Sequence, residues 1–172
     1  MGLYAETNTL RTFGSTLLEG AVGEAVLKAY IQKQGFDVID RSDDVEYQKR
    51  DIDFEFSMNG GRVYSVEVKT DNRMYDTGNI VIEDSMQRKW GNQKGWLHYC
   101  EADILCFIDV VSYKFYFFDW PRLKSLVLSG KWSLITFNNY TDNCFGKLYK
   151  ISVNELRDLG LIRAEGSLYL GN

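Results

Sequence analysis

Two neighbouring segments of alternating polarity constrain this chain more than any other feature. Residues 50–57 alternate apolar and acidic side chains, and residues 62–70 alternate valines with serine, glutamate and lysine. Side chains of an extended strand point to opposite faces in turn, so each segment reads as a strand with one apolar and one polar face. The sequence Met-Asn-Gly-Gly at 58–61 is typical of a turn. The pattern predicts a β-hairpin with charge gathered on one face.

The rest of the chain predicts helices and short strands around this hairpin. Apolar residues at helical spacing indicate a helix over 14–35. Ser152 and Glu155 have the spacing of a capping box. The order predicts one domain of α/β class, with a mixed central sheet flanked by helices. The other expected elements are strands at 36–39, 80–82, 103–110, 115–118, 133–138 and 147–152, and helices at 84–99, from Trp120-Pro121 onward and at 153–159.

Composition excludes several kinds of site. The 172 residues suit a single domain, and the net charge of −4 argues against binding nucleic acid through overall charge, though not through a local basic groove. One histidine, His98, excludes a site built on two histidines of one chain. Three cysteines without a CxxC pair favour reduced thiols. Residues 1–6 lack the features of a signal peptide, and no apolar run reaches the ~20 residues of a membrane span, so we expect a cytoplasmic protein without a membrane partner.

The charged face of the hairpin has two explanations. Asp51, Asp53 and Glu55 follow one strand, and like charges two residues apart repel. Exposure to water would resolve the repulsion, as would a divalent cation, because Mg²⁺ binds a few carboxylate oxygens together with water and phosphate. Lys69 lies two residues after Glu67 and therefore on the same strand face. A lysine there is placed to act on a water molecule or on a phosphate.

Three short motifs together resemble the PD-(D/E)xK nuclease superfamily, which includes restriction endonucleases, Holliday junction resolvases and phage nucleases. They are Gly20…Gly23-Glu24, Asp51-Ile52-Asp53-Phe54 and Val66-Glu67-Val68-Lys69-Thr70. The resemblance covers about residues 20–110 and implies a restriction endonuclease-like αβββαβ core. No proline precedes either aspartate, which departs from the pattern of many members.

The resemblance also implies roles for individual residues. Asp53, which has apolar neighbours on both sides, matches the first metal ligand better than Asp51 does. Glu67 resembles the second ligand, and the carbonyl of Val68 often completes such a site. Lys69 resembles the lysine that acts on the attacking water. Glu24 resembles the acid of the first helix, which holds a metal or braces the site.

Candidates for contact with nucleic acid follow the hairpin. Arg73 lies in the loop after Lys69, and a mixed basic and aromatic segment includes Arg88, Lys89, Gln93 and Lys94. The same segment also fits an amphipathic helix that packs its tryptophans inward. In some members of the superfamily a glutamine or lysine from the helix after the lysine strand completes the site. Here Gln93 is preferred for that role over Gln87 and Lys94.

The function expected from these residues is Mg²⁺-dependent cleavage of DNA, with Mn²⁺ as a substitute. The DNA would be duplex or branched. A single domain without an evident target-recognition module favours a structure-selective or weakly specific enzyme or, by analogy with the superfamily, a homodimer. Three alternatives stay open: a non-catalytic module that keeps the fold to bind nucleic acid or protein, a ribonuclease, since the motif does not specify the sugar, and a structural or inhibitory protein of a mobile element.

Overall fold

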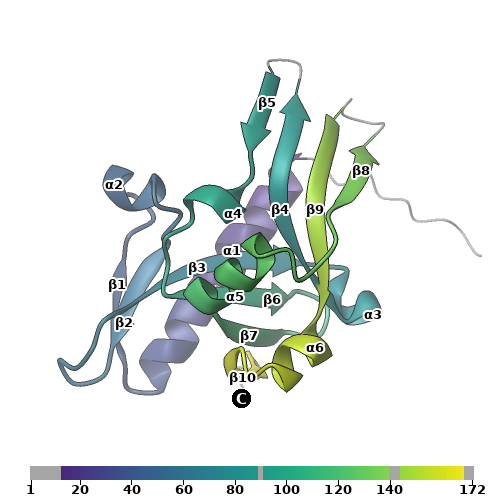
Figure 1. Cartoon of the computed structure of the whole chain (residues 1–172). Coiled ribbons are helices and arrows are strands. Elements are labelled where there is room, and N and C mark those ends of the chain that lie inside the picture. Colours follow the sequence, from purple (N-terminus) through teal and green to yellow (C-terminus); the bar gives the residue numbers. More distant parts are fainter. Residues whose placement is uncertain (1–12, 89–90, 140–143, 169–172) are drawn as a thin grey trace, which may run out of the picture.

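Six strands form a mixed sheet through the middle of the molecule (Figure 1). In the computed structural model, which describes residues 13–88, 91–139 and 144–168, only β3 and β6 pair in parallel, and the other pairs of this sheet are antiparallel. The strands, in spatial order, are β1 (Asp37–Asp40), β2 (Phe54–Ser57), β3 (Tyr64–Asp71), β6 (Ile104–Asp109), β7 (Lys114–Asp119) and β10 (Ile162–Ser167).

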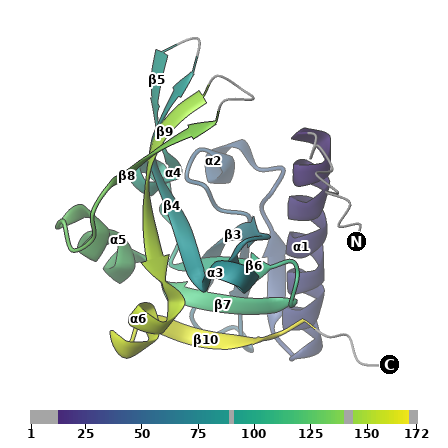
Figure 2. The same ribbon diagram turned by 90° about the vertical axis from the view of Figure 1, so that its right-hand side faces the viewer.

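Helix α1 (Phe13–Lys33) covers one face of this sheet, as Figure 2 shows. Its residues Leu27 and Ile31 pack into a buried cluster with Phe54 of β2 and Val66 of β3. A glycine permits the close approach of the helix to β3, because a Cβ at Gly23 would lie 2.7 Å from the side chain of Thr70. Helix α1 therefore packs closely against β3.

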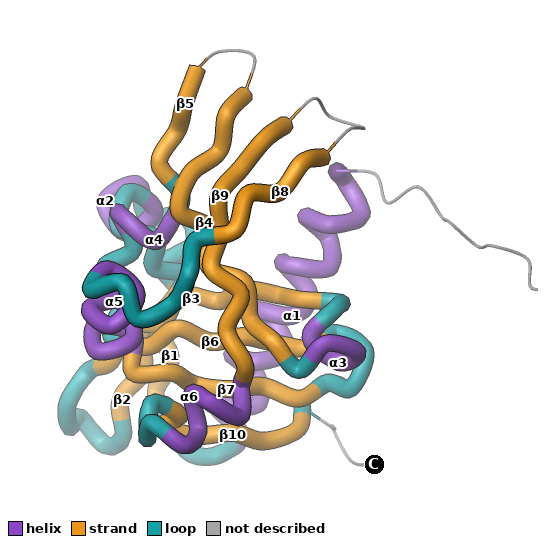
Figure 3. The backbone as a smooth tube through the Cα atoms, turned by 45° about the vertical axis from the view of Figure 1, so that its right-hand side comes forward, coloured by secondary structure: helices purple, strands orange, loops and turns teal. Residues whose placement is uncertain are grey.

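A second sheet of four antiparallel strands packs against the opposite face and extends beyond it (Figure 3). At its base Ile80, Ile82 and Ile151 are fully buried and join a core cluster with residues of β6 and β7. Short helices complete this layer: α2 (Val45–Gln48), α3 (Met74–Thr77), α4 (Trp96–Tyr99), α5 (Trp120–Leu128) and α6 (Val153–Asp158). The strands, in spatial order, are β5 (Gly91–Lys94), β4 (Asn79–Arg88), β9 (Cys144–Ser152) and β8 (Ile135–Asn139).

The structure confirms a mixed α/β fold and the hairpin, in which Phe54 pairs with Val66. The helix predicted over 84–99 is wrong: that segment contains the end of β4, strand β5 and the single turn α4. The second helix of the expected αβββαβ order is therefore replaced by a strand hairpin and one-turn helices. Ser152 is the N-cap of α6, but its side chain makes no capping hydrogen bond, so the capping box is absent.

Two further findings concern chemistry and location. Cys100 and Cys106 are buried free thiols, as expected for structural cysteines. Among the helices of the described ranges, none is long and apolar enough to cross a membrane.

Candidate active site

The site begins where β2 and β3 separate. Beyond the pair Phe54–Val66 the two backbones diverge, and the carboxylate of Asp53 accepts a hydrogen bond from the backbone N–H of Val68 at 2.7 Å. Val68 pairs with Cys106 of β6 on one side, and on the β2 side, where it lacks a strand partner, the carboxylate of Asp53 takes that place. Since the N–H and C=O of one strand residue point to the same edge, the carbonyl of Val68 also points to the edge that Asp53 occupies.

Burial shapes the charge state of Asp53. Loss of solvent is the largest effect and raises its pKa to about 6, while the hydrogen bond from Val68 opposes the rise. The charge of Glu24 raises the pKa further and that of Lys69 lowers it. Asp53 is therefore a carboxylate that an added positive charge would stabilise.

Glu67 is the more extreme case. Glu67 is only 3% exposed, and one oxygen of its carboxylate, Oε2, is buried without any hydrogen-bond partner. Burial raises the pKa of Glu67 to about 9, against the lowering effect of Lys69, and the charges of Asp53 and Asp51 add to the rise. A buried carboxylate oxygen without a partner is costly, so each such atom in a structure needs a physical reason.

Lys69 supplies the positive charge closest to these acids. Its ammonium contacts Oε1 of Glu67, lies 3.2 Å from the carboxylate of Asp51, and sits 5.3 Å from the ring centroid of Trp96. Burial lowers the pKa of Lys69, but the charges of Glu67 and Asp51 outweigh it and raise the pKa above its usual value. In the absence of a metal this lysine is an ammonium that balances charge, not a base.

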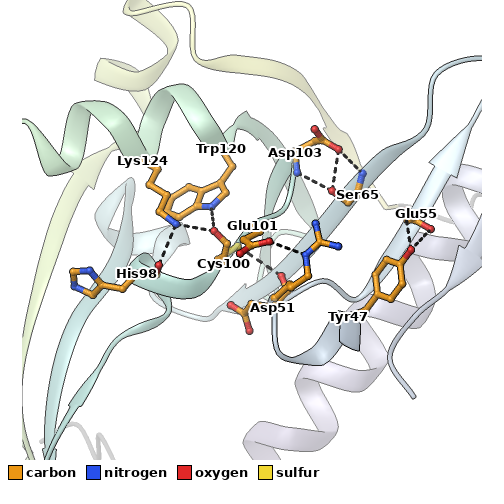
Figure 4. Close-up of polar contacts among 11 residues, drawn as sticks. Tyr47, Asp51, Glu55, Ser65, His98, Cys100, Glu101, Asp103, Trp120 and Lys124 are labelled. Carbon is orange, nitrogen blue, oxygen red and sulfur yellow. Dashed lines mark hydrogen bonds and ion pairs between the residues drawn. The ribbon is translucent and has the colours of Figure 1, made fainter. Parts of the chain in front are cut away.

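Asp51 joins the site through an unusual backbone. Its φ of 54° lies in the left-handed region, which breaks the strand alternation expected over 50–57. The thiol of Cys100 contacts its carbonyl at 3.6 Å, and the carbonyl of Cys100 accepts hydrogen bonds from Trp120 Nε1 and Lys124 Nζ (Figure 4). The connection between α4 and β6 therefore holds the loop that presents Asp51 to Lys69.

Glu24 and Glu55 have other partners. Glu24 lies on the face of α1 that meets the site and accepts a hydrogen bond from Lys28 at 2.8 Å. Lys28 also contacts Asp40, so it links Glu24 to β1. Glu55 is paired with Arg41 and Tyr47 and takes no part in the cluster around Lys69. Glu24 therefore braces Lys28 and acts on Asp53 through its charge.

The fit to a divalent cation can be tested on these atoms. Within the described part of the chain, no three side chains of His, Cys, Asp and Glu are grouped so that they could hold a metal ion. Mg²⁺ needs fewer, because it keeps several waters and binds proteins through one or two carboxylates. Asp53, Glu67 and the carbonyl of Val68 fit that smaller set, and the buried Oε2 of Glu67 gives the strongest reason for a cation.

The predicted nucleic-acid contacts are scattered. Arg73 is exposed in the turn after β3. Arg88 ends β4, where only its backbone is described, and Lys89 lies outside the described residues. Gln93 and Lys94 are exposed on β5, on opposite faces of the strand, and neither belongs to the cluster around Lys69. These residues therefore do not form one patch on a helix.

The sequence does not indicate the place of two residues in the site. Asp51 matches a metal ligand less well than Asp53 does, yet its carboxylate lies 3.2 Å from Lys69. Trp96 follows the mixed basic and aromatic segment, and no motif marks it, yet its ring lies over Lys69. The tolerance of aspartate for left-handed backbone is the one local signal for Asp51. Nothing local indicates the contact of Trp96, which depends on distant packing.

Comparison with known proteins yields a likeness of fold. No family model matches the chain, and no curated protein matches it. Among solved structures it is similar to a bacterial homing endonuclease, I-Ssp6803I, with a TM-score of 0.53 and 17% sequence identity. The match covers 87% of this chain and 89% of that chain, so it includes both sheets and not the site region alone. At this identity the likeness concerns the fold.

Proposed function

We propose that this protein is a metal-dependent endonuclease that cleaves DNA. Asp53 and Glu67, with the carbonyl of Val68, would hold Mg²⁺, and Mn²⁺ would substitute for it. One observation carries the proposal: the half-buried carboxylate of Asp53 and the buried one of Glu67, both with raised pKa values, meet a lysine where β2 leaves the edge of β3, and one oxygen of Glu67 has no partner. The fold likeness to a homing endonuclease supports DNA as the substrate.

The chemistry assigned to each residue follows from its surroundings. A bound divalent cation would supply positive charge against the negative charge of the scissile phosphate. Lys69, held between Glu67 and Asp51 as an ammonium, would add a second positive charge and orient the attacking water. Asp53 keeps its carboxylate in place through the Val68 N–H, so the site needs little reorganisation.

Roles outside the cluster are also proposals. Glu24 would tune Asp53 through its charge and brace the site through Lys28. Arg73, which is exposed in the turn between β3 and α3, would contact the phosphate backbone. A homodimer would present two such sites and cut both strands of a duplex, whereas a monomer would nick one strand at a time.

The test is a cleavage assay on supercoiled plasmid, branched DNA, single-stranded DNA and RNA, with Mg²⁺ or Mn²⁺. We expect DNA cleavage by the wild type and a large loss in Lys69→Ala. A matched control is Lys114→Ala, an exposed lysine on β7 outside the cluster. Equal rates for wild type and Lys69→Ala would refute the mechanism, and cleavage of RNA alone would make the protein a ribonuclease.

A readout independent of activity is stabilisation by the metal. Mg²⁺ should raise the melting temperature of the wild type and leave that of Asp53→Asn unchanged, because a ligand stabilises only the state that binds it. A folded wild type that neither gains stability from Mg²⁺ or Mn²⁺ nor cleaves any substrate would be a non-catalytic module.

A further inference from the structure

The second sheet carries two rows of side chains on one exposed face. Strand register places directly paired residues on the same face of a sheet. One row crosses all four strands as Lys94, Ser85, Lys147 and Thr136. The next row, further from the core, is Asn92, Gln87, Phe145 and Asn138. We call the surface formed by these eight residues the outer face. Six of the eight line one shallow hollow together with Gly146.

The outer face continues the face that packs on the core. Along β9 every second residue shares a face, so Lys147 and Phe145 follow the fully buried Ile151 in the same direction. Lys94 lies two residues before Trp96, whose ring lies over Lys69. The outer face therefore begins next to the candidate active site and extends away from it along the projecting strands (Figure 3).

The chemistry of the outer face differs from that of an ordinary solvated strand. Its charged members are both lysines, and no carboxylate belongs to either row. Within the described ranges, no side-chain hydrogen bond or ion pair engages Lys94, Lys147, Gln87 or Asn92. The nearby Asp84 is paired with His98 at 3.0 Å, and Glu83 lies on the opposite face with Leu148. The surface is thus positive and rich in free amides.

The opposite face of the same strands explains how the outer face stays ordered. Gly146 is covered on that side, because an added Cβ would lie 2.3 Å from the ring of Phe137 and 2.9 Å from the sulfur of Met86. The strands therefore pack on one face, and on the other face the lysines and amides of the two rows are exposed. An open polar face that is not needed for packing is available for a ligand.

We propose that the outer face lies against the major groove of duplex DNA and selects the sequence that the active site receives. This inference rests on the proposed function. Asparagine and glutamine amides pair with the edge of adenine, and lysines neutralise phosphates. The ~12 Å major groove admits a two-stranded β-ribbon, and strands spaced ~4.8 Å apart let two neighbouring strands of the outer face enter it together. Gln87, Asn92 and Asn138 would read bases, and Lys94 and Lys147 would contact phosphates.

The test compares neighbouring residues on opposite faces of the same strand. Asn92→Ala changes the outer face, and Gln93→Ala changes the other face of β5. Lys147→Ala changes the outer face, and Lys150→Ala changes the other face of β9. All four side chains are exposed, so the variants should fold, and their melting temperatures verify this. The probe is a pool of random 40-bp DNA duplexes, bound in Ca²⁺ and sequenced after selection.

We expect the wild type to enrich a sequence pattern. Asn92→Ala should relax the preference at one base-pair position about tenfold. Lys147→Ala should weaken binding to all sequences and reduce the slope of log affinity against log salt by about 1. Gln93→Ala and Lys150→Ala should stay within about twofold of the wild type. Equal effects of the two members of either pair, no sequence preference in the wild type, or equal binding of a random RNA duplex pool would overturn the inference.

The two proposals fail in different ways. A wild type that selects a DNA sequence but does not cleave it in Mg²⁺ or Mn²⁺ refutes the nuclease and leaves the reading surface in place. A wild type that cleaves DNA, while Asn92→Ala and Gln93→Ala cut the same sequences at the same rates, refutes the reading surface alone.

Discussion

Replacing Glu67 with glutamine separates the cost of burying a carboxylate from the benefit of binding a cation. Glutamine has nearly the shape of a protonated glutamate, so the change removes the ionisation without opening a cavity. Burial raises the pKa of Glu67 from 4.5 to about 9. Between these values the folded protein holds a proton that the unfolded chain releases, so the contribution of Glu67 to stability falls as pH rises.

The magnitude follows from this window. Each pH unit between the two pKa values costs the wild type about 1.4 kcal/mol. From pH 5 to pH 7 the wild type should therefore lose roughly 2–3 kcal/mol of unfolding free energy that Glu67→Gln retains. In the difference between the two proteins, the titration of groups that do not interact with Glu67 cancels. At pH 5 the two should have similar stability, and at pH 7 the variant should be more stable.

Urea unfolding of the metal-free proteins at pH 5, 6 and 7, in EDTA, measures this difference. Glu46→Gln, an exposed glutamate of α2, is the control for loss of one surface charge. In a parallel series, Mg²⁺ at 100 times its Kd should stabilise the wild type by ~2.7 kcal/mol and leave Glu67→Gln unchanged. A stability difference that is the same at pH 5 and pH 7 would refute the argument that burial of Glu67 is costly.

Four further changes test the geometry of the site and its scaffold. Asp53→Asn should keep the fold but lose stabilisation by Mg²⁺, seen as an unchanged melting temperature on adding the metal; a shift equal to that of the wild type would remove Asp53 from the ligand set. Lys69→Ala should slow DNA cleavage by about 100-fold or more, because a positioned charge and proton donor is lost. Its binding of DNA, measured by anisotropy, should change far less, and a proportional loss of both would reduce Lys69 to a binding residue. Gly23→Ala should destabilise the protein by about 1–3 kcal/mol, since the new methyl meets Thr70 at 2.7 Å. Gly20→Ala, with 4.0 Å to the same residue, should instead stabilise α1 by about 0.5–1 kcal/mol in chemical denaturation.

The hairpin could be predicted because its information is local. Alternation over 62–70 and over the part of 50–57 that forms β2 specifies which side chains share a face, and the glycines at 60 and 61 mark the turn; before β2 the left-handed backbone at Asp51 breaks the alternation. Period-two placement of Glu67 and Lys69 therefore needed no knowledge of the rest of the fold. The position of Asp53 also follows from the hairpin register, although its hydrogen bond to Val68 depends on the divergence of the two strands.

The second sheet could not be predicted in the same way. Strand β4 pairs with β9, more than fifty residues further along the chain, and no local pattern encodes that partner. Within residues 84–94 the outer face is polar, and the opposite face packs only a few apolar side chains. The segment therefore lacks the regular alternation of apolar and polar residues that indicates a strand. A glycine at position 95 is a sequence signal against a helix over 84–99. In the structure the backbone of Gly95 passes so close to Glu83 that a Cβ would lie 2.2 Å from the carbonyl oxygen of Glu83.

The separation of β2 from β3 is the structural origin of the candidate site. Had β2 continued as a regular partner, the backbone of Val68 would be fully paired, and Asp53 would have no N–H to bind. Because the chain instead turns at Asp51 through left-handed backbone, Asp53 takes the vacated edge and Asp51 reaches Lys69. Three acids thus meet one lysine in a largely buried place, and with Lys69 as the one cation among the described side chains of the cluster, burial keeps Glu67 protonated in the absence of a metal. The fold keeps these acids close at a cost in stability, and a divalent cation is the ligand that would reverse that cost.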